Sequence, residues 1–239
     1  FTTHTYVQVM KTTPIFMALK NTVILTVVGT AISMFCTICT AYALSKKRLF
    51  GRTAFLAMIT FTMIINAGMI PNFILIKNLQ LMNTYWAIWL PGAISTWNML
   101  VMKTFFSALP DSLEESAVID GANDLRILVS IVLPLSVPSI ATITLFYAVG
   151  YWNSYFDAMI YMTTRSKMPL SVFLRDILIL NDSSDMTAAM DPDALVSLQE
   201  RQNVMKYALI MVSSVPMFLL YPFVQRYFIK GVMIGSVKG

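Results

Sequence analysis

Long apolar runs separated by short polar segments make up most of this chain. Each run is close to the roughly 20 residues that an α-helix needs to cross the hydrocarbon core of a bilayer. Because backbone groups in lipid must be hydrogen-bonded within the segment, we predict an all-α, multi-span transmembrane helical bundle with about five spans in a single domain, 1–239. The predicted spans run from Lys20 to Leu44, Ala54 to Ile76, Tyr85 to Phe106, Ser139 to Met162 and Tyr207 to Phe228.

One polar and amphipathic segment, 109–138, lies between the third and fourth predicted spans. Pro110 favours a helix start, and Ser112 with Glu115 three residues later predicts a capping box, in which each side chain bonds a free backbone N–H of the first turn. Gly121 predicts the end of this helix, because glycine adopts the left-handed conformation of a helix terminus at the lowest cost. The segment is therefore expected to begin with a short capped helix.

A second helix is expected directly after this turn. Asn123 or Asp124 can cap its first turn. The helix then continues into apolar sequence that contains Pro134 and Pro138, where lost backbone hydrogen bonds predict a kink. The segment is thus predicted to form a helix, a glycine turn and a second helix that leads into a span.

The first of these helices has one apolar face. Leu109, Leu113 and Ala117 recur at four-residue spacing, whereas acidic residues keep the rest of the helix polar. Since the segment lies between spans, this face has no membrane to enter. We therefore expect Leu113 and Ala117 to enter a cleft of another protein.

The spacing in this segment resembles the cytoplasmic EAA loop of binding-protein-dependent ABC importer permeases. That loop has the order E-A-A, three residues, G-A, then about ten residues to a hydrophobic L-P. Ser116 departs from the usual alanine, which exchanges one small residue for another. The matching positions are Glu115-Ser116-Ala117, Gly121-Ala122 and Leu133-Pro134.

The similarity extends over nearly the whole chain to the carbohydrate-uptake class, the maltose-type "G" permeases and their oligosaccharide relatives. It includes Asn21-Thr22 at the start of the first span and the ending GVMIGSVKG. The resemblance implies a type I importer permease that pairs with a second homologous permease subunit and two ATPase subunits, which hold ATP and magnesium. It also implies an extracytoplasmic solute-binding protein that delivers a sugar or an oligosaccharide.

In that family the EAA loop docks into a cleft of the ATPase, and the glutamate that matches Glu115 pairs with a basic residue there. The alternative role for Glu115 is only to close the capping box with Ser112. The residues that the resemblance implies at the ATPase contact are Glu115, Ser116, Ala117, Asp120, Gly121 and Ala122.

The composition excludes an ordinary soluble domain, because 57% of the residues are hydrophobic and 12% are charged, against about a quarter charged in soluble proteins. The net charge of +5 does not indicate nucleic acid, since the basic residues form no patch interleaved with aromatic residues. Instead they indicate orientation. Lys46, Lys47, Arg48 and Arg52 follow the first span and are predicted to be cytoplasmic.

Alternate crossings from this cluster place 110–126 and the C-terminus in the cytoplasm and 163–203 outside, in a bacterial plasma membrane. An odd number of crossings that ends inside must begin outside, whereas the permeases that the chain resembles usually have six spans with both ends inside. Absence of the usual first span is the expected explanation. A cleaved signal segment is the alternative.

Polar residues within two predicted spans mark a candidate substrate path, since polar groups at membrane depth usually face a bundle interior or a water-filled cavity. Asn and Asp can hydrogen-bond sugar hydroxyls, and Trp and Tyr rings can stack on a sugar. Helix packing or an interfacial aromatic belt is the alternative. The candidates are Asn98, Trp152, Asn153, Tyr155 and Asp157.

The outer region 163–203 is the longest polar piece. It contains an amphipathic run from Pro169 to Arg175. The resemblance implies a short outer helix in this region, which the binding protein touches. The acidic stretch 182–193 lacks the alternating spacing and the glycine of a calcium loop, so we expect a solvated loop rather than a metal site.

Other chemistry has little support in the sequence. There is no G-x-x-x-x-G-K-[ST] loop, so we expect no enzyme activity in this chain and an energy supply from a partner ATPase. Cys36 and Cys39 lie within an apolar run, which favours packing over redox or metal chemistry. An integral-membrane enzyme would need a partner for Asp157, and a stand-alone ion-coupled transporter would need paired charges or broken helices at the midplane.

Overall fold

The structure is a computed structural model that describes residues 15–65, 67–180, 207, 210, 211, 214–216 and 218. All regular structure in this part of the chain is helical, which confirms the all-α prediction. The acidic stretch 182–193, most of the last predicted span and the C-terminal tail lie outside the described residues.

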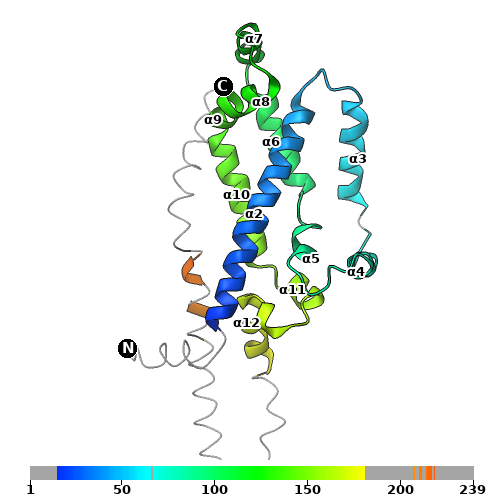
Figure 1. The fold of residues 1–239 in the computed structure, drawn as a ribbon, viewed down its shortest axis with the longest axis vertical. Helices are drawn as coiled ribbons and strands as arrows, with labels where there is room; N and C mark the ends of the chain where they lie inside the picture. Colours follow the sequence, from blue (N-terminus) through cyan, green and yellow to red (C-terminus); the bar gives the residue numbers. More distant parts are fainter. Residues whose placement is uncertain are drawn as a thin grey trace, which may run out of the picture.

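The longest element is α2, Ile15–Ser45, which covers the first predicted span. Its 31 residues are apolar enough to cross a membrane unaided. Figure 1 shows α2 running from the end of the molecule that holds α12 to the end that holds α7. It packs along α10 and α6, so it is the central element of the described bundle.

Two predicted spans are divided rather than continuous. The second consists of α3, Arg52–Ile64, and α4, Met69–Asn78, with a bend of 112° between them. The third consists of α5, Trp86–Trp89, and α6, Thr96–Ser107, because Pro91 and Gly92 interrupt the helix before Ser95 caps α6. Each of these two predicted spans is therefore formed by two helices.

The segment that follows contains α7, Asp111–Ile119, and α8, Asp124–Ile127. A π-helical turn, η1 at Leu128–Val132, and a single turn, α9 at Leu133–Leu135, lead to α10, Val137–Trp152. The axis bends by 85° between the stretch ending at Leu135 and α10, at the position of the two prolines. The predicted kink is therefore confirmed.

The fourth predicted span is also interrupted, since α10 ends at Trp152 and α11, Tyr155–Tyr161, begins after a turn. A 3₁₀ turn, η2 at Arg165–Lys167, then precedes α12, Leu170–Leu180, which confirms the predicted short helix of the outer region. Within the described residues one helix meets the requirements of a span, or up to three if each bent pair crosses once. The count of about five stays a prediction.

The core lies where α2 meets α10 and the α5–α6 region. Gly29 of α2 allows this close approach, because a Cβ there would lie 2.9 Å from the rings of Trp89 and Tyr151. Ser33 hydrogen-bonds to the Tyr151 hydroxyl at 2.9 Å, and Thr37 hydrogen-bonds to the Tyr147 hydroxyl at 2.7 Å. The core is thus tightly packed and also contains buried polar links.

Candidate functional site

The helix α7 starts without a side-chain cap. Pro110 is the N-cap residue and Asp111 is already helical, so Ser112 lies inside the helix. The Ser112 carbonyl accepts a hydrogen bond from the Ser116 hydroxyl at 2.9 Å. The predicted capping box is therefore wrong, and Glu115 has no capping role in the structure.

The turn after α7 has the geometry expected from its glycine. Gly121 has φ +78°, and its N–H donates to the Val118 carbonyl at 3.0 Å. The Ala122 N–H donates to the Ala117 carbonyl at 2.9 Å, which completes the paired bonds of a Schellman motif. This confirms the predicted left-handed helix end.

The second helix is capped by Asn123, whose side-chain oxygen accepts from the Arg126 N–H at 2.9 Å. Asp124, the other predicted cap, instead forms an ion pair with Arg48. Because Asn123 caps the helix, the Asp124 side chain can bind Arg48 of the basic cluster that follows α2.

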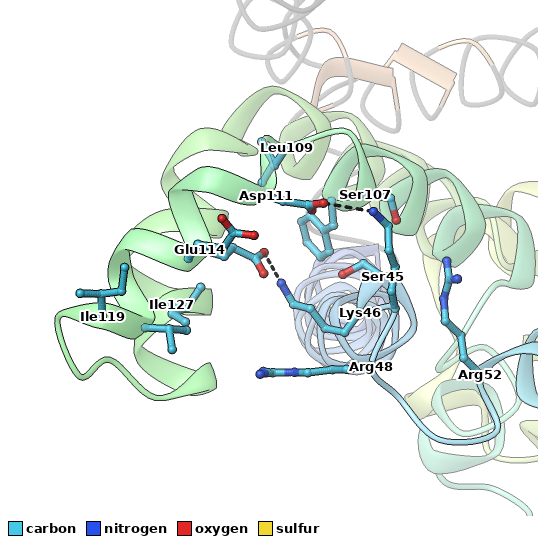
Figure 2. A pocket seen from close by; sticks show the side chains of 14 residues that line it. Ser45, Lys46, Arg48, Arg52, Ser107, Leu109, Asp111, Glu114, Ile119 and Ile127 are labelled. Carbon is cyan, nitrogen blue, oxygen red and sulfur yellow. Dashed lines mark hydrogen bonds and ion pairs between the residues drawn. The ribbon is translucent and has the colours of Figure 1, made fainter.

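Three ion pairs connect this basic cluster to the 109–138 segment. Figure 2 shows the Lys46 side chain directed at Glu114 of α7, with which it pairs. The remaining pairs are Lys47 with Asp111 at 3.1 Å and Arg48 with Asp124. The basic cluster and the 109–138 segment thus lie at the same end of the molecule, as the predicted orientation requires.

A cavity of about 620 Å³ lies between the end of α2 and α7 (Figure 2). Glu115 lines it and is exposed, and unlike Asp111 and Glu114 it forms no ion pair with any described residue. Val118 and Ile119 also line the cavity and are 52% and 85% exposed. In the cavity, α7 therefore presents the Glu115 carboxylate, without an ion partner among the described residues, beside exposed apolar side chains.

The apolar face of α7 differs from the one predicted. Ala117 is buried in the core of this chain, so it cannot enter a cleft of another protein. Leu113 is 41% exposed. Val118 and Ile119 were missed, because the four-residue pattern assigned them to the polar side. Of the six residues predicted to contact an ATPase, Glu115, Ser116, Asp120 and Gly121 are exposed, Ala122 is partly buried and Ala117 is buried.

A second cavity, of about 420 Å³, is lined by residues of α5, α6, α10 and α11. It brings together two of the predicted path residues, the buried Asn98 and the exposed Asp157. Tyr147 and Tyr151 of α10 line the same cavity and were not predicted. Their four-residue spacing within an otherwise apolar helix is the sequence signal that could have found them.

The remaining predicted path residues lie elsewhere. Trp152 and Asn153 line a separate cavity of about 260 Å³ beside α12. Tyr155 lines neither of these cavities, and its ring lies 5.5 Å from the guanidinium carbon of Arg175. The break after α10 thus separates five residues that the sequence placed together.

The described residues contain no group of three or more His, Cys, Asp or Glu side chains that could hold a metal ion. Cys36 and Cys39 are free thiols on α2, one partly buried and the other exposed.

The chain is 46% identical, over its full length and 82% of the relative, to the polygalacturonan/rhamnogalacturonan transport system permease protein YtcP of Bacillus subtilis (strain 168). It is 42% identical to Protein LplC of the same organism, over its full length and 80% of that relative. It also resembles a chain of a crystal structure of a bacterial ABC transporter involved in the import of the acidic polysaccharide alginate. That match has a TM-score of 0.82 and 35% identity, and it covers 94% of this chain and 79% of the other. No family model matches the chain.

These relatives are transport permeases rather than enzymes. The identity and the coverage show that the chain belongs to the family of carbohydrate ABC transporter permeases. It is therefore a helical, multi-pass protein of the cytoplasmic (inner) membrane that takes part in sugar transport.

Proposed function

We propose that this chain is one of two permease subunits of an ATP-driven carbohydrate importer, and that its segment 109–138 transmits the action of a cytoplasmic ATPase. The observation that carries the proposal is the exposed Glu115 carboxylate of α7, which has no ion partner among the described residues. The helix ends in the Gly121 turn. An exposed carboxylate next to exposed apolar side chains is suited to a protein partner with a basic residue.

The two other carboxylates within α7 support the assignment of Glu115 as the contact residue. Asp111 and Glu114 are bound by lysines of this chain, so they are already neutralised. Glu115 has no cap to maintain, since Ser112 lies inside the helix. Its charge is therefore available to an ATPase, with Val118 and Ile119 as apolar contacts beside it.

The 420 Å³ cavity is the proposed part of the translocation path in this subunit. Its lining offers the Asn98 amide, which can exchange hydrogen bonds with sugar hydroxyls. The Tyr147 and Tyr151 hydroxyls are already bonded to Thr37 and Ser33, so these two residues contribute the surface of their rings. The substrates of the relatives make oligosaccharides with uronic acid units the first substrates to test. Asp157 is the charged residue in the described lining, so carboxylates of such a sugar would have to be bound by the second permease.

Outside the membrane, α12 is the proposed contact for the solute-binding protein, and the C-terminus is proposed to be cytoplasmic. Arg165 and Lys167 in the turn before α12 are exposed and give this end a basic character. ATP and magnesium would be held by the partner ATPase.

The test is reconstitution of the whole transporter. We expect a second permease and an ATPase to copurify with this chain. We also expect uptake of a uronic acid oligosaccharide into proteoliposomes to require ATP on the cytoplasmic side of the membrane and the binding protein on the opposite side. Uptake that persists without ATP would contradict the proposal.

The path is tested by two variants and a matched control. Asn98→Ala and Asp157→Asn alter the 420 Å³ cavity and should each lower sugar-stimulated ATPase activity several-fold, as expected for the loss of one or two hydrogen bonds to the substrate. Asn153→Ala changes an exposed amide that donates within its own helix to Val149 at 2.9 Å, and it should have a smaller effect. The reverse order would place the sugar in the cavity beside α12.

A further inference from the structure

Asn21 and Thr22, near the start of α2, form hydrogen bonds to the segment that leads into α12. The proposed function assigns no role to these bonds. The Asn21 amide donates to the Ser166 carbonyl at 2.7 Å and to the Met168 carbonyl at 3.2 Å. The Thr22 hydroxyl accepts from the Leu170 N–H at 2.8 Å and donates to the Ala18 carbonyl at 2.9 Å. Leu170 is the first residue of α12, so these two side chains hold the start of α12 against α2.

Apolar packing strengthens the same junction. Ile15 and Ala18 of α2 form a buried cluster with Leu170 and Phe173 of α12, separate from the main core. Asn21 and Thr22 are themselves only 7% and 1% exposed. Because a buried N–H or amide that loses its partner carries the full cost of desolvation, these bonds hold the start of α12 firmly to α2.

The other parts of α2 contact the other proposed sites. Ser33 and Thr37, in the middle of the helix, hydrogen-bond to Tyr151 and Tyr147, which line the 420 Å³ cavity. The residues directly after α2 form the ion pairs with α7 and α8. One continuous helix thus contacts α12, the wall of the cavity and the 109–138 segment (Figure 1).

We propose that Asn21 and Thr22 are positioning residues that make α12 and α2 a single moving unit, so that docking of the binding protein on α12 changes the position of the 109–138 segment on the ATPase. The inference rests on the proposed function, in which α12 and α7 face these two partners. A partner can shift the transporter only by binding one of its conformations more tightly, and the shift then appears at the distant site as a coupling free energy. A loosened α12 could bind its partner without moving α2.

The variant that tests this is Thr22→Val, which keeps the shape of the side chain and removes the acceptor for the Leu170 N–H. In the complete transporter we expect binding-protein stimulation of the ATPase to fall about tenfold, the effect of leaving one buried N–H unpaired. Basal ATPase activity and copurification of all subunits should equal those of the parent. Thr22→Ser keeps the hydroxyl and should restore most of the stimulation.

Thr26→Val is the matched control. Thr26 lies one turn further along α2, is 7% exposed, and its buried hydroxyl has no hydrogen-bond partner among the described residues. The same replacement there should leave stimulation unchanged. Equal loss in Thr22→Val and Thr26→Val, unchanged stimulation in Thr22→Val, or parallel loss of basal and stimulated activity would each overturn the proposal.

A second measurement tests the coupling between α12 and the 109–138 segment even if the Thr22→Val transporter fails to assemble. In the parent transporter, amide hydrogen exchange of residues 163–175 and of residues 109–127 should change together when the sugar-loaded binding protein is added. A change confined to one of the two segments would refute the inference. Failure of the proposed function is distinct, since the parent transporter itself would then show no stimulation by a binding protein.

Discussion

The proposed outer end of α2, beside α12, and its proposed inner end, beside α7, are held by opposite kinds of interaction (Figure 1). At the outer end, neutral hydrogen bonds from Asn21 and Thr22 are almost completely buried. At the inner end the contacts are ionic and largely open to solvent: in the Lys47–Asp111 pair the side chains are 82% and 73% exposed. The Lys46–Glu114 pair is less exposed, at 15% and 27%.

This difference has an energetic consequence. An exposed ion pair contributes about 0–1 kcal/mol and is weakened by salt, whereas breaking a buried hydrogen bond costs about 1–3 kcal/mol and is not screened. The outer junction is thus suited to persist through a cycle, and the inner one to be broken and formed again. A long helix can thus be fixed to one segment and only loosely attached to another.

The largest expected effect concerns the partner at the inner end. Glu115→Gln keeps the size of the side chain and removes the charge, and we expect the affinity of the permease pair for the ATPase to fall by about 2–5 kcal/mol, or some thirtyfold to several-thousandfold. The measurement is titration of the purified ATPase onto the permease pair in nanodiscs, alongside sugar uptake.

The control for this change is Asp176→Asn, which removes one negative charge from α12 at the opposite end of the molecule. Glu114→Gln is not a neutral control, because it breaks the pair with Lys46. Retention of the ATPase by Glu115→Gln at the parent affinity would show that the contact is not electrostatic.

The next largest effect is expected at the junction between α2 and α12. Asn21→Ala leaves the Ser166 and Met168 carbonyls without this donor, so opening of the α2–α12 junction should become about 1–3 kcal/mol easier. Amide exchange of residues 163–170 should rise about fivefold or more, equally at low and at high salt. Asn153→Ala, which removes an amide bonded within its own helix, serves as the control. Salt-dependent exchange would show that the junction is not a neutral one.

A smaller effect is expected at the turn between α7 and α8. Gly121→Ala places a Cβ at φ +78°, which costs about 1–2 kcal/mol, although the Cβ itself would meet no atom within 4 Å. We therefore expect weaker ATPase binding from backbone strain alone, and a similar loss for Gly121→Leu. Ser116→Ala, at an exposed hydroxyl that bonds within α7, should bind as the parent does. Equal affinities of Gly121→Ala and Ser116→Ala would mean that the turn can rearrange freely.

The smallest effect tests the exposed ion pairs themselves. Lys47→Gln should destabilise the attachment of α7 by less than about 1 kcal/mol, and the difference from the parent should disappear in concentrated salt. Amide exchange of residues 109–120 at two salt concentrations measures it. A large effect that survives high salt would contradict the view of the inner end as a weak, reversible contact.

Local chemistry allowed several features to be predicted from the sequence. The Gly121 turn, the Asn123 cap and the kink at the prolines each depend on a few adjacent residues. The predicted capping box was wrong for an equally local reason. The helix begins at Asp111, so Ser112 lies within the first turn and is not the N-cap residue.

Features that depend on distant residues could not be predicted in this way. Hydropathy did not locate the breaks in the second and third predicted spans, because apolar residues lie on both sides of Gly68 and Pro91. The partners of Lys46 and Thr22, residues Glu114 and Leu170, lie far away in sequence. The cavity around Asn98 likewise depends on how α6, α10 and α11 meet.

The length of α2 also has a consequence for the lipid around the transporter. Its 31 residues extend over about 46 Å, against a hydrocarbon core of roughly 30 Å. Such a helix tilts or protrudes, and its tilt responds to hydrophobic mismatch. Since both ends of α2 are attached to other segments, a change in acyl-chain length would alter the tilt of the helix and pull on both attachments at once. Bilayer thickness is thereby expected to act as a physical regulator of this permease, independent of sugar and of nucleotide.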